Sequence, residues 1–342
     1  MIKLADGFSA ATAAARTVGG NGGHDLPSKP QGSRGSPGST ERGNADKAEL
    51  EFNTGRCGAR QMPLVRLKLR VSPFVTTDFT GKFVKTLLIN ANPNLERIFE
   101  DKRTPSPKPL RITPLLEDGT EEPVYPKVVI KRFGEAAGKP KSSPNPIAVN
   151  GLYHVYVGYE SGLEPEVDLA VTKLMGGVEL EYGSQVRVRL VEYEKVERRV
   201  PREFSSVKVY FITPAVFVDP FVKFSSLDGD RAKRFVPYPP LIFSVNVYDV
   251  FRKTYGRNII RLSYALVESH TVLNTVTKVW YYYDGKWLPG VIGYAKFFLR
   301  KGVPERAKEA VRKVLENAME MGVGSGRAAG FGFVKVKFDT TG

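Results

Sequence analysis

The sequence predicts an α+β protein in which one β-α-β-β-α-β unit, with an antiparallel sheet, occurs twice. Strand-like and helix-like segments follow one another in that order from residue 62, and the same order returns from about residue 207. Pairs of strand-like segments interrupt the alternation of strand and helix, which disfavours a parallel, doubly wound sheet. Each unit is the ferredoxin-like, or RRM-like, arrangement. The 342 residues suit two such domains in tandem, at roughly 150 residues each.

The first predicted domain covers residues 62–202. Its first strand, 64–71, alternates apolar with mostly basic residues, as expected when one face of a strand is buried. A helix is predicted over about 77–90, and its apolar inner face consists of Phe79, Phe83, Val84, Leu87 and Leu88. The remaining elements are extended segments at 110–116, 124–130 and 153–159, a Gly-, Pro- and Ser-rich insertion at 134–151, a short helix at 164–175 and a hairpin within 178–192.

The second predicted domain covers residues 203–342. Apolar residues at three- and four-residue spacing predict an amphipathic helix over 304–321, and Gly322 suits its left-handed C-terminal cap. The other elements are a strand at 207–213, a helix within 239–254, strands within 263–280 and 291–299 around a turn at 281–285, and a final strand at 331–338.

Residues 1–61 differ in composition from the rest of the chain. They hold eleven of the 33 glycines and little periodic apolar content, too little to offset the chain entropy of folding. We therefore expect a disordered N-terminal extension, with Met62 as the natural start of the protein. A genuine regulatory tail is the alternative.

The formal net charge of +15 favours an acidic partner, with nucleic acid ahead of an anionic membrane. No apolar run approaches the roughly 18 residues that span a bilayer, so a membrane partner is not expected. One cysteine and three widely spaced histidines make no metal-ligand pattern, and no metal or cofactor is predicted. Scarce glutamine and cysteine are typical of thermophilic prokaryotes, archaea among them, and we expect a cytoplasmic protein.

The stretch GVGSGRAAGFGFV, residues 322–334, is the most distinctive motif of the chain. It follows a helix and precedes a strand, the reverse of the order in a dinucleotide-binding fingerprint, and it lacks the Gly-Lys-Ser/Thr of a P-loop. Free amides beside a cation suit a phosphate chain. A tight helix-to-strand connection without a ligand is the alternative. The candidate RNA contacts here are Gly322, Gly324, Ser325, Gly326, Arg327, Gly330, Phe331 and Gly332.

Four segments resemble motifs of the CRISPR repeat-RNA (pre-crRNA) processing endoribonucleases of the RAMP superfamily, and they occur in the same order as in that family. They are FSSVKVYFITPAVF at 204–217, with Thr213-Pro214, FVPYPPLIFSVNVYDVF at 235–251, LPGVIGYAKFFL at 288–299, and the glycine-rich stretch. They cover much of the second half of the chain, which would be a RAMP domain. The first half matches the family only in its pattern of elements.

The resemblance implies an enzyme that binds the repeat of a precursor CRISPR RNA and cuts it without a metal. The 2′-hydroxyl attacks the adjacent phosphate, leaving a 2′,3′-cyclic phosphate and a 5′-hydroxyl. The glycine-rich loop and the cleft between the domains would hold the RNA. The alternatives are a non-catalytic RNA-binding subunit of a CRISPR interference complex and a basic scaffold for a protein partner. The protein would be a monomer or a homodimer.

The region that matches the family's reacting groups, about 77–109, has no histidine. Its candidate catalytic cations are Lys82, Lys85, Lys102 and Arg103, which would stabilise the negative phosphorane. A solvated helix face is the alternative for each of them. His154, in a predicted strand, is the candidate base, although a lone strand histidine is more often structural. Further RNA contacts are expected at Arg231, Lys233 and Arg234, in a basic loop.

Overall fold

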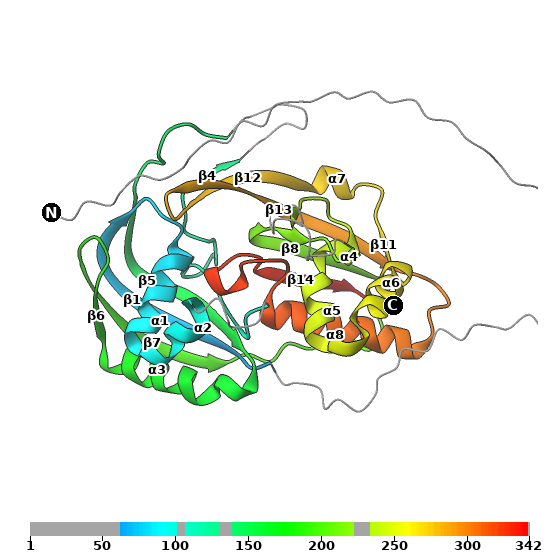
Figure 1. Cartoon of the computed structure of the whole chain (residues 1–342), viewed down its shortest axis with the longest axis horizontal. Coiled ribbons are helices and arrows are strands. Elements are labelled where there is room, and N and C mark those ends of the chain that lie inside the picture. Colours follow the sequence, from blue (N-terminus) through cyan, green and yellow to red (C-terminus); the bar gives the residue numbers. More distant parts are fainter. Residues whose placement is uncertain (1–61, 101–106, 130–138, 222–232, 341–342) are drawn as a thin grey trace, which may run out of the picture. The chain divides into compact units, whose positions relative to one another are not determined.

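The computed structural model describes residues 62–100, 107–129, 139–221 and 233–340, and these belong to one compact unit (Figure 1). The predictions for residues 1–61 lie outside this part of the chain. The described residues form two antiparallel sheets, each with helices packed on one face, as the sequence predicts. The fold is α+β with two ferredoxin-like halves.

The first sheet has the strand order β2-β5-β1-β7-β6, and β3 adds to β5. Its strands are β1 (Leu64–Thr76), β2 (Leu110–Ile112), β3 (Leu116–Glu117), β5 (Ile147–Tyr159), β6 (Val178–Glu181) and β7 (Gln185–Lys195). The helices of this half are α1 (Thr80–Ala91), α2 (Glu96–Glu100) and α3 (Glu164–Gly176).

The core of the first half follows the alternation along β1. Val65, Leu67, Leu69 and Val71 are buried and share a cluster with residues of α1 such as Phe83. Each side chain of this size contributes about 1.5–3 kcal/mol when fully buried. The intervening residues of β1 point to the opposite face, where Leu64 is buried with Leu116, Tyr156 and Phe333. We call it the open face of the first sheet because the helices of this core do not cover it.

The second sheet has the strand order β14-β8-β13-β12-β4, and β11 adds to β13. Its strands are β8 (Ser206–Ala215), β11 (Leu266–Glu268), β12 (Val276–Tyr283), β13 (Lys286–Leu299), β14 (Val334–Asp339) and β4 (Lys127–Val129). The helices of this half are α4 (Pro239–Ile242), α5 (Ser244–Phe251), α6 (Tyr255–Ala265), α7 (Val272–Thr275) and α8 (Glu305–Met321), and a two-stranded ribbon joins β9 (Phe217–Val218) to β10 (Lys233–Arg234).

The structure corrects several predicted boundaries. β5 begins at residue 147, inside the predicted insertion. Part of the predicted strand region 263–280 is helical, because the three-residue spacing of Ile259, Leu262 and Ala265 extends the buried face of α6. β12 continues to Tyr283 into the predicted turn, and β14 begins at Val334 rather than at residue 331.

One strand of the first half belongs to the second sheet. β4 pairs with β12, so that Val128 lies opposite Trp280 at the edge of that sheet. The predicted extended segment at 124–130 is therefore strand in part, but it pairs across the expected domain division rather than within the first domain. The division itself, at residues 202 and 203, stays a prediction.

Candidate functional site

All five glycines of the loop between α8 and β14 have positive φ angles, which favour glycine. Two of them also allow a close approach of backbone. A Cβ atom at Gly324 would meet the carbonyl oxygen of Val216, and one at Gly332 would meet that of Val323. Gly322 ends α8 at the predicted position, but its φ of +73° and ψ of −174° lie outside the left-handed helical region that the prediction assumed. The glycines are therefore required by the packing of the loop on its own chain.

The amides of the loop are largely used within the protein. Val323 donates to the carbonyl of Gly332 at 2.8 Å, Ser325 to that of Val216 at 2.8 Å, and Gly332 to that of Pro214 at 3.0 Å. The amide of Phe333 donates to the hydroxyl of Thr213 at 2.9 Å. The expectation of a run of free amides is wrong for these positions, and any RNA contact has to use other groups of the loop.

The four segments that carry the family resemblance converge on this loop. Thr213 and Pro214 accept its amides, as described above, and β13 packs against the same strand, with Val291 opposite Ala215. Segment 235–251 supplies Asn246, whose amide donates to the carbonyl of Gly322 at 2.8 Å. The motifs are distant in sequence, but they build one local structure.

Two of the predicted RNA contacts are buried structural residues instead. The Arg327 side chain is only 4% exposed and pairs with Asp249 of α5 at 2.9 Å. The pairing offsets part of the free-energy cost of burying each charge. Phe331 is 7% exposed and packs with Phe79 and Tyr281 at centroid distances of 4.7 and 4.8 Å. Neither side chain is available on the surface for a base or a phosphate.

The loop packs against the start of α1. A Cβ atom at Gly81 would meet the carbonyl oxygen of Ala329, and one at Gly330 would lie 3.3 Å from the Cα of Gly81. Phe79, which precedes α1, is fully buried and its amide donates to the carbonyl of Tyr282 at 3.0 Å. The beginning of α1, the loop and the β12–β13 hairpin thus form one junction, which we call the α1–loop junction.

Lys82 lies at this junction, on the first turn of α1. Its Nζ donates to Asp284 at 2.7 Å and to Asp78 at 3.2 Å, and the side chain is 36% exposed. Burial alone would lower the pKa of Lys82, but the hydrogen bonds to Asp284 and Asp78 raise it well above its ordinary value. Lys82 is therefore a fixed cation and cannot act as a general base near neutral pH.

The other candidate cations of this region are placed differently. Lys85 is 17% exposed, and its Nζ lies 2.5 Å from a carboxylate oxygen of Glu100. Lys102 and Arg103 fall outside the described residues. Lys82 is thus the candidate that the structure places beside the glycine-rich loop.

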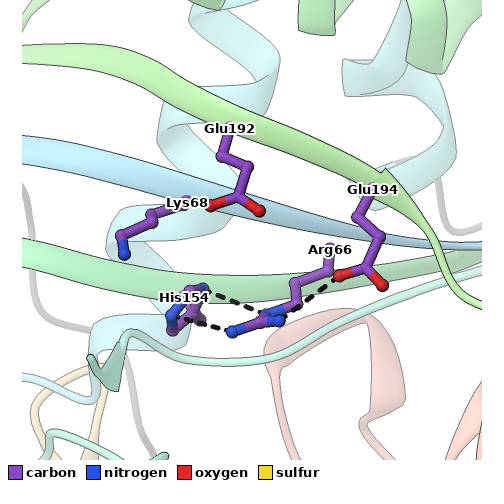
Figure 2. A pocket seen from close by; sticks show the side chains of 5 residues that line it. All are labelled: Arg66, Lys68, His154, Glu192 and Glu194. Carbon is purple, nitrogen blue, oxygen red and sulfur yellow. Dashed lines mark hydrogen bonds and ion pairs between the residues drawn. The ribbon is translucent and has the colours of Figure 1, made fainter. Parts of the chain in front are cut away.

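His154 lies on the open face of the first sheet, where Arg66, Lys68, Glu192 and Glu194 surround a small depression (Figure 2). It stands opposite Lys68 in the β1–β5 ladder. The α1 helix packs on the other face of this sheet, so Lys82 and His154 do not share one site.

The imidazole of His154 is 2% exposed and engaged at both nitrogens. Arg66 donates from Nε to Nδ1 at 3.2 Å, and its Nη2 lies 3.0 Å from Nε2, which also contacts an oxygen of Asp118 at 2.5 Å. Hydrogen bonds from Lys68 and His154 lower the pKa of Asp118. This arrangement holds the imidazole within the protein, and the assignment of His154 as the catalytic base stays a prediction.

Two cations of the predicted basic loop lie near the glycine-rich loop. Lys233 and Arg234 form β10, which pairs with Val218 and Phe217 of β9. Arg234 contacts Asp219 at 2.9 Å. The carbonyl oxygen of Val216, directly before β9, accepts a hydrogen bond from the amide of Ser325 in the glycine-rich loop. Since β10 pairs with β9, it lies one strand away from the loop. Arg231 falls outside the described residues.

Sequence reasoning missed the acidic partners of Lys82 and one buried arginine. Asp284 precedes Gly285 at the β12–β13 turn, and this Asp-Gly pair was a visible hairpin signal. Arg111 of β2 is fully buried and donates to the carbonyls of Glu320 and Met319 at the end of α8, at 2.5 and 3.2 Å. No local pattern around Arg111 indicated this contact between the two halves.

Among the residues that the structure describes, no helix is long and apolar enough to cross a membrane. Within the same residues, no group of three or more His, Cys, Asp or Glu side chains is placed to hold a metal ion.

The two sheets and the loop between α8 and β14 define a tandem ferredoxin-like protein, and solved Cas6 structures have the same fold. A Cas6 product complex aligns with a TM-score of 0.53 at 17% identity, over 82% of this chain and 100% of the other. Thermus thermophilus Cas6 gives a TM-score of 0.49 at 15% identity, over 82% and 99% of the two chains. An RAMP protein that binds different RNA substrates gives 0.46 at 10% identity, over 80% and 99%.

No protein-family model matches the sequence, and no curated protein does. At 17% identity, the likeness to the Cas6 product complex establishes the fold. The chain has the Cas6 fold, in agreement with the sequence resemblance.

Proposed function

We propose that the protein is an endoribonuclease that binds CRISPR repeat RNA and cleaves the precursor to guide RNAs without a metal. The observation that carries the proposal is the fixed cation Lys82 at the α1–loop junction, in a chain with the Cas6 fold. A preorganised cation stabilises the charge that develops on a phosphorane without reorganising during the reaction.

The reaction would be an in-line transesterification. The 2′-oxygen forms a bond to the phosphorus and loses its proton, while the bond to the 5′-oxygen breaks and that oxygen gains a proton. The hydrogen bonds that raise the pKa of Lys82 keep it protonated, so its role is charge stabilisation. Proton transfer would fall to water, which suits a slow enzyme.

A bound phosphate would compete with the two carboxylates that hold Lys82. Asp284 is 72% exposed on a hairpin turn, whereas Asp78 is 16% exposed. Asp284 is therefore the partner that RNA would displace, while Asp78 would keep the ammonium group in place.

The second candidate function is a non-catalytic RNA-binding subunit of a CRISPR complex. The internal pairing of His154 with Arg66 and Asp118 favours it, because it removes the candidate base of the described residues from solvent. Both functions predict RNA binding, and they differ in whether the RNA is cut.

The test is incubation of the purified protein with end-labelled repeat RNA from the CRISPR locus of the same genome, in excess EDTA. The proposal predicts one cut, with a 2′,3′-cyclic phosphate on one product and a 5′-hydroxyl on the other. Tight binding without any cut would favour the non-catalytic subunit. A strict requirement for Mg²⁺ would contradict the mechanism.

A further inference from the structure

The second sheet carries a regular set of rings and lysines on the face opposite its helices. Along β8, Val207, Val209 and Phe211 are buried in the core with α5, α6 and α8. Lys208 and Tyr210 alternate with them and are partly exposed, so they point to the other face. We call it the open face of the second sheet.

The strand register lines these side chains up across β14, β8 and β13, which lie side by side in Figure 1. Tyr210 stands opposite Tyr294 on one side and Lys335 on the other. In the next row, Lys208 stands opposite Lys296 and Lys337. Neighbouring strands are about 4.8 Å apart, so each row is a continuous band of side chains.

The contacts within this set pair rings with rings and cations with rings. The Tyr210 and Tyr294 centroids are 5.4 Å apart, and the Lys337 Nζ lies 5.5 Å from the Tyr210 ring. Phe298, 42% exposed, continues the set along β13, and the Lys296 Nζ lies 5.1 Å from its ring. The rings are thus held in place, with Phe298 exposed and the two tyrosines partly exposed.

Positive charge exceeds negative charge on this face. Its four lysines are Lys208, Lys296, Lys335 and Lys337. Two carboxylates contact them: Asp339 lies 3.1 Å from Lys296, and Glu121 pairs with Lys335. Exposed rings that alternate with lysines match the two parts of a nucleotide, a base that stacks and a phosphate that carries charge.

We propose that the open face of the second sheet binds a single-stranded segment of RNA. Bases stack on Tyr210, Tyr294 and Phe298, and phosphates contact the lysine row of Lys208, Lys296 and Lys337. The inference rests on the proposed function for the biological source of the RNA, a segment of the precursor outside the cleaved phosphate. A protein partner fits less well, because lysine is depleted in the cores of protein interfaces.

This surface is separate from the α1–loop junction. The loop contacts β8 at Thr213 and Pro214, whereas the rows of rings and lysines lie at Lys208 and Tyr210. Thr213 lies three residues along the strand from Tyr210 and five from Lys208, which is about 10 and 17 Å at roughly 3.4 Å per residue. One RNA chain of several nucleotides could therefore contact both places.

The test measures the affinity of the full chain for a fluorescent single-stranded oligouridine, with the same sequence in a duplex for comparison. The double substitution Tyr210→Ala and Tyr294→Ala should weaken single-strand binding by about tenfold or more, since lost stacking typically costs that much. The double Phe variant should retain most of the affinity. Tyr264→Ala, at a 57% exposed ring on α6, is the matched control and should change nothing.

A second measurement covers the case in which the alanine variant does not fold. Lys208→Gln and Lys337→Gln should each reduce the dependence of log affinity on log salt by about 0.7, the value for one phosphate contact with a single strand. Wild-type affinity in the folded alanine variant, an unchanged salt dependence, or no single-strand binding by the wild type would overturn the proposal. Wild-type affinity in the folded alanine variant would favour an acidic protein surface as the partner of this face.

The proposed cleavage is judged independently, on repeat RNA. If the wild type binds oligouridine through the rings but never cuts repeat RNA, the surface stands and the endoribonuclease proposal fails. If repeat RNA is cut at the wild-type rate and oligouridine binding does not depend on the rings, the reverse holds.

Discussion

At the scale of single residues, some charged side chains of this protein are buried in pairs that stabilise the fold, and others are exposed on the surface. The sequence alone does not show which are which. Arg327 is a cation in a glycine-rich loop, a setting typical of phosphate binding. Its partner Asp249 lies 78 positions away, so nothing near Arg327 reveals that the charge is buried. The same holds for His154, whose hydrogen-bonding partner Asp118 lies 36 positions away. The sequence singles out Lys82 as a candidate catalytic cation, but it does not indicate the two carboxylates, Asp78 and Asp284, that hold its ammonium group.

The Arg327–Asp249 pair predicts a loss of stability when it is broken. Arg327→Ala should lower the free energy of unfolding by about 3–5 kcal/mol, because it leaves the Asp249 carboxylate buried without a partner. Urea denaturation followed by circular dichroism measures the change. Arg187→Ala, which breaks an exposed pair with Glu179, is the control and should leave stability essentially unchanged. Equal stability of the two variants would contradict the burial of Arg327.

Glu320 predicts a dependence of stability on pH. Burial, with the neighbouring Glu316, raises the pKa of Glu320 to about 8, against an ordinary value of 4.5. The folded state keeps this proton where the unfolded chain loses it, so stability should fall as the pH rises from about 4.5 to about 8. Glu320→Gln removes the effect. It should match the wild type near pH 4 and exceed it at pH 8.5 by on the order of 4 to 5 kcal/mol.

Thermal and urea unfolding at several pH values test this prediction. Glu203→Gln, at a carboxylate that is 71% exposed, is the control and should follow the wild type at each pH. A constant difference between Glu320→Gln and the wild type across this range would show that Glu320 is ionised in the folded protein.

Asp284 predicts a gain in RNA affinity. Asp284→Asn removes the carboxylate that competes with a phosphate for Lys82, while asparagine still tolerates the φ of +49° at this turn. We expect tighter binding of repeat RNA, by a few-fold at low salt, with a smaller gain at high salt because the competition is electrostatic. Filter binding at two salt concentrations measures it. Weaker binding by Asp284→Asn would mean that the RNA does not reach Lys82.

At the scale of elements, regular periodicity was sufficient to predict most helices and strands of the described residues. The amphipathic spacing over 304–321 gave α8, and the alternation along 64–71 gave β1. The errors arose where the pairing of one strand with another determines the secondary structure. β4 is three residues long and is strand because β12 lies beside it, which no local pattern shows. Likewise, the buried face of α6 continues into a segment whose β-branched and aromatic residues suggested a strand.

The contact of α1 with the loop predicts an unequal response of two helical glycines to alanine. Gly81→Ala places a Cβ atom against the carbonyl oxygen of Ala329, so α1 or the loop has to shift. We expect a loss of about 1–3 kcal/mol, the usual cost of overpacking, together with weaker RNA cleavage. Gly176→Ala, at the end of α3, meets open space and should be neutral or slightly stabilising. Equal stabilities would contradict the close packing of α1 on the loop.

At the scale of the whole molecule, the two halves meet through backbone and buried side chains around the glycine-rich loop. Arg111 of the first half holds the end of α8, and Gly81 of α1 lies against the loop itself. The proposed catalytic cation and the loop therefore come from different halves of the chain. The net charge of +15 would attract RNA over long range, and the two proposed contact surfaces are the places where we expect it to bind.

The central claim is that Lys82 stabilises a transition state in which the RNA's own 2′-oxygen attacks the phosphate. The most direct measurement is the single-turnover cleavage rate of repeat RNA in EDTA, with ribose or 2′-deoxyribose at the scissile nucleotide, for the wild type, Lys82→Ala and Lys85→Ala. We predict that the wild type cuts the ribose substrate and not the deoxy substrate. Lys82→Ala should slow cleavage by about 10²–10³, far more than the roughly few-fold loss of RNA affinity expected from one lost phosphate contact. Lys85→Ala, whose ammonium is paired with Glu100, should lose less than about tenfold. Cleavage of the deoxy substrate, or a Lys82→Ala rate equal to that of the wild type, would contradict the account.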